Sequence, residues 1–123
     1  MTVHALTQKI NQLTENKEFA LALLLVKQHP HYQENYMFND AYATLLYCTN
    51  QFTEARKIIS FNIELIFKQS ANTTALLSCY YLKSLCYLAE NNTVKSQDYL
   101  NKCLRLSANY PELHKQFQQL LRV

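Results

Sequence analysis

The chain has 123 residues, of which 49% are hydrophobic and 17% charged, and a net charge of +3. These values predict one domain with a packed core, and the charge is too small to indicate nucleic acid or an anionic membrane as the partner. Because the chain contains no glycine, the glycine-rich loops that bind dinucleotides or nucleotide phosphates are excluded.

Apolar residues recur at helical spacing along the whole chain, and short polar segments interrupt the pattern. With only two prolines and no glycine, the chain is predicted to be all-α, with about seven helices. The predicted helices span residues of about 2–14, 19–28, 34–48, 53–70, 75–89, 94–106 and 111–121. Pro30 is expected to end the second helix, and Pro111 suits the first turn of the last one.

The segment Cys48-Thr49-Asn50-Gln51-Phe52 predicts a tight turn between two helices. Asparagine tolerates the left-handed conformation that glycine usually adopts after a helix, so Asn50 is expected to hold that position. Thr53 is then expected to N-cap the following helix.

The helices pair in a repeated phase. Small residues stand near the start of the second helix of each pair, at Ala22, Ala55 and Ser96. A large apolar residue precedes each by nine positions, namely Leu13, Leu46 and Tyr87. The small residues are 33 and 41 positions apart, and two helices per unit with a period in the mid-thirties predicts a solenoid of α-hairpins.

On these residues the chain resembles the tetratricopeptide repeat family, whose pattern is W-x2-L-G-x2-Y followed by A-x3-F and P. The last repeat fits best, with Tyr80, Ser84, Tyr87, Ser96 and Leu100 at the family's Trp, Gly, Tyr, Ala and Phe positions. The second repeat carries Tyr42, Ala43, Leu46, Ala55 and Ile59, and the first is degenerate. The departures are Lys83 in place of Leu, Asn39 in place of Trp and Ala108 in place of Pro.

The resemblance implies a single domain over 1–123 that forms a short right-handed solenoid. Its repeats would span about 2–33, 34–72 and 75–108, and a capping helix would cover 111–121. In this family the first helix of each pair lines the binding groove. Transferred to this chain, the groove residues are Thr7, Asn11, Met37, Asp40, Thr44, Tyr47, Ser78, Tyr81, Leu85 and Leu88. Packing of these residues against neighbouring helices in a small core is the alternative.

Of these, Met37, Asp40, Thr44, Tyr47, Tyr81, Leu85 and Leu88 are the predicted partner-binding residues. The family members that clamp acidic tails use Lys, Arg and Asn in the groove, and only Asn11 matches here. The apolar surface therefore favours an apolar helix or an extended peptide of a partner protein.

No candidate catalytic, cofactor or metal site is predicted. His29 and His31 flank Pro30 in an expected loop, with no Cys or acidic residue close in sequence. Cys79 and Cys86 share a helix face and are expected to pack as small apolar residues, although four cysteines also allow a disulfide framework. The absence of an apolar leader predicts a cytoplasmic protein, and no run is long enough to span a membrane.

The sequence thus predicts a non-enzymatic protein-interaction module with no small-molecule substrate. It resembles the short cytoplasmic chaperones of type III secretion, which hold an apolar segment of a client. It also resembles self-dimerising scaffold subunits such as those of the anaphase-promoting complex, and a dimer would then form through the N-terminal helix pair. A helical-repeat RNA binder is the third alternative, based on basic residues near the C-terminal end, Lys95, Lys102, Arg105, Lys115 and Arg122.

Overall fold

The computed structural model describes residues 2–29, 34–69 and 72–121 of the chain. Within these ranges it is all-α, as predicted, and contains no strand. The helices are α1 (Val3–Glu15), α2 (Phe19–Lys27), α3 (Tyr36–Cys48), α4 (Phe52–Gln69), α5 (Thr73–Ala89), α6 (Thr93–Leu106) and α7 (Pro111–Leu121). None of them is long and apolar enough to cross a membrane. The predicted loop residues Pro30 and His31 lie outside the described ranges.

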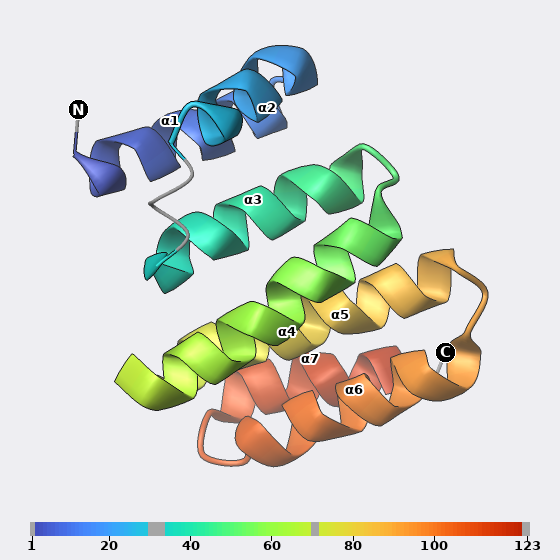
Figure 1. Ribbon diagram of the computed structural model, residues 1–123. Helices are drawn as coiled ribbons and strands as arrows, with labels where there is room; N and C mark the ends of the chain where they lie inside the picture. Colours follow the sequence, from blue (N-terminus) through green and yellow to red (C-terminus); the bar gives the residue numbers. More distant parts are fainter. Residues whose placement is uncertain (1, 30–33, 70–71, 122–123) are drawn as a thin grey trace.

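The helices form three antiparallel hairpins, α1–α2, α3–α4 and α5–α6, followed by α7 (Figure 1). The first helices of successive hairpins lie side by side, because α3 contacts both α1 and α5. Each hairpin also packs its second helix against the first helix of the next one, and α7 packs against α6. This arrangement is a short solenoid-like stack, in which each hairpin contacts its sequence neighbours.

The three hairpins turn in the same way. Lys17, Asn50 and Asn91 all have φ between 62° and 64°, so each occupies the left-handed region that the chain reaches without glycine. In each turn the next residue's N–H donates to a backbone carbonyl five positions back, at 2.8 Å, and the acceptors are those of Leu13, Leu46 and Tyr87. This bond satisfies a carbonyl at the helix end that would otherwise lack a partner.

The prediction for Asn50 is therefore confirmed, and the prediction for Thr53 is wrong. Helix α4 already begins at Phe52, and the Gln51 carbonyl accepts the first helical bond, from the Ala55 N–H. Thr53 thus lies inside the first turn. Only Gln51 separates the left-handed residue Asn50 from the first residue of α4. The helix therefore begins before Thr53 could cap it.

Lys17 is the least suitable of the three turn residues, because lysine in the left-handed region costs about 1–2 kcal/mol. Its side chain is exposed, so replacing it removes no packing. Lys17→Gly should therefore raise the free energy of unfolding by about 0.5–1 kcal/mol, measured by urea denaturation. Lys9→Gly, at an exposed position inside α1, is the control and should lower it by about 1 kcal/mol. A loss of stability in both variants would contradict the assigned turn conformation.

The longer second interval of 41 residues lengthens α4 and α5 at the ends that lie farthest from their hairpin turns. Positions are compared relative to the left-handed residue in the turn of each hairpin. On this basis α5 begins one turn earlier than α1 and α3, and α4 ends one turn later than α6. Helix α4 is accordingly long, with 18 residues, but half of the eight extra residues belong to α5. The additional turns of α4 and α5 form one wall of the candidate site.

The core is continuous between neighbouring hairpins. One cluster joins α1, α2 and α3 around Leu6, Ile10 and Phe38, and a second joins α3, α4 and α5 around Leu46, Ile59 and Ile66. A third joins α5, α6 and α7 through Leu77, Cys103 and Phe117. The small residues of the repeat are buried, with exposed fractions of 0% for Ala22, 0% for Ala55 and 4% for Ser96.

Candidate functional site

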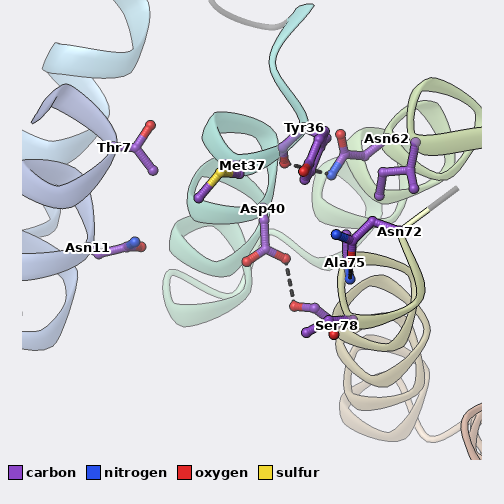
Figure 2. A pocket seen from close by; sticks show the side chains of 11 residues that line it. Thr7, Asn11, Tyr36, Met37, Asp40, Asn62, Asn72, Ala75 and Ser78 are labelled. Atoms are coloured by element: carbon purple, nitrogen blue, oxygen red, sulfur yellow. Dashed lines mark hydrogen bonds between the residues drawn. The ribbon is translucent and has the colours of Figure 1, made fainter. Parts of the chain in front are cut away.

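A cleft of about 380 Å³ opens over the aligned first helices, and we call it the Asp40 cleft. Its lining comes from α1, α3, α4 and the start of α5, namely Thr7, Asn11, Tyr36, Met37, Asp40, Asn62, Ile66, Asn72, Thr74, Ala75 and Ser78. Figure 2 shows Asp40 extending from α3 towards Ser78 on α5, with Thr7 and Asn11 on the α1 side. The cleft is therefore bounded by all three hairpins.

Asp40 is the only ionisable carboxylate among the lining residues. The Ser78 hydroxyl donates a hydrogen bond of 2.8 Å to Asp40 Oδ1, and within the described residues no Lys or Arg forms an ion pair with it. Burial raises the pKa of Asp40 above its ordinary value of 3.8, and the bond from Ser78 opposes part of that rise. The site thus holds a partly desolvated carboxylate with no cationic neighbour, surrounded by hydroxyl and amide groups.

Asn62 fixes the wall of the Asp40 cleft. Its Nδ2 donates to the Tyr36 backbone carbonyl at 3.0 Å, and its Oδ1 accepts from Asn39 Nδ2 at 3.2 Å. The same amide nitrogen lies 3.6 Å from Cys79 Sγ. Because Asn39 and Asn62 are 1% and 2% exposed, these bonds replace water and tie α3, α4 and α5 together at the edge of the cleft.

A second cleft of about 300 Å³ follows the Asp40 cleft along α5, and we call it the Leu88 cleft. It is lined mostly by apolar side chains and small polar ones, namely Tyr81, Ser84, Leu85, Leu88, Thr93, Ser96, Gln97, Leu100 and Leu120. Thr74, Ser78, Tyr81, Leu85 and Leu88 follow one stripe of α5, because they are spaced by three or four residues. The two clefts therefore share one helix face, over a length of about 21 Å.

The predicted groove residues divide among these two clefts and the packing between helices. The Asp40 cleft brings together Thr7, Asn11, Met37, Asp40 and Ser78, and the Leu88 cleft brings together Tyr81, Leu85 and Leu88. Thr44 and Tyr47 line neither one. The Thr44 hydroxyl donates to the Asp40 backbone carbonyl at 2.9 Å, and the ring of Tyr47 packs 5.7 Å from that of Phe52.

Tyr81 packs against another helix and also lines the Leu88 cleft. Its ring lies 5.9 Å from that of Phe117 on α7, in an edge-on arrangement. Helix α7 thus occupies the place beside α5 where a further hairpin would pack. This contact fixes the orientation of Tyr81 where the two clefts meet.

Burial makes three of the four cysteines unreactive. Cys79 and Cys86 are buried as predicted, Cys103 is also buried, and Cys48 is exposed; all four are free thiols. Burial raises the pKa of Cys79 to about 12, of Cys86 to about 11 and of Cys103 to about 12, so these three thiols stay protonated at neutral pH. Within the part of the chain that the structure describes, no three His, Cys, Asp or Glu residues lie together as metal ligands.

Sequence reasoning missed the α4 and early α5 residues of the Asp40 cleft, Asn62, Ile66, Asn72, Thr74 and Ala75. Ile66 lies in the extra turn of α4, and Asn72, Thr74 and Ala75 lie at or in the extra turn of α5, whereas Asn62 comes from the part of α4 that precedes it. The sequence signal for these residues was the longer spacing between repeats, 41 residues from Ala55 to Ser96 against 33 from Ala22 to Ala55. The added residues fall between two hairpin turns and therefore lengthen the helix ends farthest from those turns.

The chain matches no family model, and comparisons with curated proteins and with solved structures found no match. The resemblance to tetratricopeptide repeats therefore stays a prediction from the sequence.

Proposed function

We propose that this protein is a non-enzymatic interaction module that binds a segment of another protein along the exposed stripe of α5. The observation that carries the proposal is the alignment of the Asp40 cleft and the Leu88 cleft on one helix face. Polar and charged groups lie at one end of the stripe and apolar groups at the other. A helical segment of about 14 residues matches this length, and an extended segment would need fewer residues.

The lining chemistry supports binding without catalysis. Asp40 has hydroxyl and amide neighbours in the cleft but no histidine, lysine or cysteine with which to exchange a proton. An uncompensated carboxylate attracts a cation, and a lysine or arginine of the partner would form a charge-assisted hydrogen bond with it. The exposed side chain of Leu88, at 52%, offers apolar area at the other end. The favoured partner segment is therefore apolar with a cationic residue near one end.

A peptide-display selection tests this proposal. A library of random fourteen-residue peptides would be selected on the purified chain, and the affinities of enriched peptides would be measured by fluorescence anisotropy. We expect enriched peptides to combine apolar residues at helical or alternating spacing with one Lys or Arg at one end. Enrichment of acidic peptides without apolar residues, or no enrichment, would contradict the proposal.

The pKa of Asp40 gives a pH-dependent prediction. Because the folded-state pKa lies above 3.8, ionised Asp40 destabilises the free protein. This cost grows as the pH rises from 3.8 and is complete above the raised pKa. Asp40→Asn should raise the free energy of unfolding at pH 7, and the gain should vanish below pH 3.8. Glu64→Gln, at an exposed site on α4, is the control in the same urea titrations. A gain that persists at low pH would contradict the assignment.

Self-association through the N-terminal pair is the second candidate, and one observation favours it. Leu21 and Leu24 on α2 are 46% and 51% exposed, which leaves apolar area on the outer side of the first hairpin. Light scattering across a concentration series separates the two functions. A dimer that persists on dilution, and that Leu24→Asp dissociates, would favour a scaffold subunit. A monomer that forms a defined complex with a selected peptide would favour the client-binding module.

A further inference from the structure

A cluster of tyrosines and cations lies on α4, α5 and α6, apart from both clefts, and we call it the Tyr99 cluster. Its members are Arg56, Tyr80, Lys83, Tyr87, Lys95, Asp98, Tyr99, Lys102 and Arg105, with Glu90 bound to Arg56. The ring of Tyr99 stacks 5.7 Å from that of Tyr87 and lies 6.0 Å from that of Tyr80. The side chains of α6 and Tyr87 enclose a hollow of about 380 Å³.

Cations lie against the tyrosine rings of this cluster. Lys83 Nζ and Lys102 Nζ lie 4.8 and 4.7 Å from the centre of the Tyr99 ring. The Arg56 guanidinium and Lys95 Nζ lie 4.9 and 5.4 Å from the centre of the Tyr87 ring. Such contacts are attractive, and here they hold several cationic groups within a small area.

The charge of the cluster is not balanced locally. Five of the 12 Lys and Arg residues of the chain lie here, with only two of its 9 acidic residues. The rest of the chain carries seven cations and seven acids, so the whole net charge of +3 resides in this cluster. Glu90 is already held by Arg56 through two bonds of 2.7 and 2.8 Å, and Asp98 is left to face Lys95, Lys102 and Arg105 around the hollow.

The geometry of the rings decides which kind of anion fits. Proteins that bind single-stranded nucleic acid present open aromatic faces on which bases stack. Here Tyr99 has two cations and two tyrosine rings around it, and Tyr87 has two cations and one ring. The faces are therefore occupied, and what remains for a ligand is a set of ammonium and guanidinium donors. Carboxylates accept such bonds without any stacking.

We infer that the Tyr99 cluster is a second binding site, which takes an acidic segment of a protein through its glutamate and aspartate carboxylates. It lies on another part of the surface from the α5 stripe and does not depend on the proposed function. Lys95, Lys102 and Arg105 supply the contacts, because they line the hollow and are exposed. Lys83 is 9% exposed and donates to Ser60 Oγ at 2.8 Å, so it adds charge from beneath the rings.

A fluorescein-labelled peptide of ten glutamates tests the inference by anisotropy at low ionic strength, alongside a ten-nucleotide uridine strand. The test variant carries Lys95→Gln, Lys102→Gln and Arg105→Gln. The matched control carries Lys9→Gln, Lys27→Gln and Lys68→Gln, which removes the same charge at exposed sites elsewhere. Circular dichroism would verify that both variants are folded. Asp98→Asn is a further variant, which removes the acid that faces the hollow.

We expect the wild-type chain to bind the glutamate peptide with an affinity that falls with added salt. The test variant should weaken binding at least about tenfold and the control less than about threefold, whereas Asp98→Asn should strengthen it. Equal weakening in both triple variants would show an effect of net charge alone and overturn the inference. Absence of binding by the wild-type chain would also overturn it, as would tighter binding of the uridine strand than of the peptide.

Discussion

Asn62→Ala should lower the free energy of unfolding by about 2–4 kcal/mol, the largest loss of stability that we predict for a single polar side chain. Asn62 is 2% exposed and bridges Asn39 and the Tyr36 carbonyl. Alanine removes both bonds, so the Asn39 amide loses this acceptor and the Tyr36 carbonyl loses this donor. It also opens a small cavity, because the surrounding helices relax only in part. Urea denaturation followed by circular dichroism measures the change.

A double-mutant cycle with Asn39→Ala tests the pairing itself. If the bond of 3.2 Å between the two side chains contributes as the geometry indicates, the two substitutions together should cost about 1 kcal/mol less than the sum of the single ones. Asn101→Ala, at an exposed position of α6, should change stability by less than about 0.5 kcal/mol. Additive effects, with a loss below about 1 kcal/mol for Asn62→Ala, would contradict the proposed role of this amide.

Leu88→Asp should weaken the binding of selected peptides by at least about tenfold, the largest effect of a single substitution on affinity that we predict. A leucine that becomes buried by a partner contributes about 1.5–3 kcal/mol, and an aspartate in its place must also lose its water on binding. The fold should persist, because Leu88 is 52% exposed in the free chain. Fluorescence anisotropy with the enriched peptides measures the affinity.

Val94→Asp is the matched control for this experiment. Val94 is 71% exposed, lies on α6 and lines neither cleft. It therefore tests the effect of one exposed apolar side chain and one added negative charge without touching the α5 stripe. We expect peptide affinity to stay within about twofold of the wild-type value. Equal weakening by the two substitutions would place the binding surface elsewhere.

Local sequence patterns predicted the fold because the turns and the core depend on near neighbours. Asn50 adopts the left-handed conformation expected for an asparagine between two amphipathic runs. Ala22, Ala55 and Ser96 are buried at the positions that the repeated phase assigned to them. These features follow from backbone sterics and helical periodicity, and neither requires knowledge of the tertiary structure.

The two clefts were only partly predictable, because contacts across hairpins are not visible in local spacing. The stripe of α5 residues was expected, but the wall made by Ile66 and Asn72 depends on how far α4 and α5 extend. Thr44 and Tyr47 were assigned to the groove by position in the repeat, whereas the structure leaves them outside both clefts.

The departures from the repeat pattern were the most informative positions. Asn39 and Lys83 stand where large apolar residues were expected, and both are buried in the structure. Asn39 pairs with Asn62, and Lys83 pairs with Ser60 and lies against Tyr99. Each polar departure thus marks a network between helices, one beside the Asp40 cleft and one beneath the Tyr99 cluster. Their hydrogen-bond partners, Asn62 and Ser60, are each 23 residues away on α4. Local sequence spacing does not indicate contacts at this separation.

The spacing of α6 could have indicated the Tyr99 cluster. Lys95, Tyr99 and Lys102 lie on one face of α6, as Tyr80, Lys83 and Tyr87 do on α5. The basic residues were instead grouped by their place near the end of the chain. That grouping included Lys115 and Arg122, whereas Lys115 lines no part of the hollow and Arg122 lies outside the described residues.

Chemical-shift mapping on the isotope-labelled chain, titrated with the tightest peptide from the display selection, tests the central claim most directly. We predict that the amide signals that shift most belong to Asp40, Ser78, Tyr81, Leu85 and Leu88, which lie along the two clefts. Shifts confined to the outer helices α2, α4 and α6, with the α5 stripe unchanged, would contradict the claim that this stripe binds a partner.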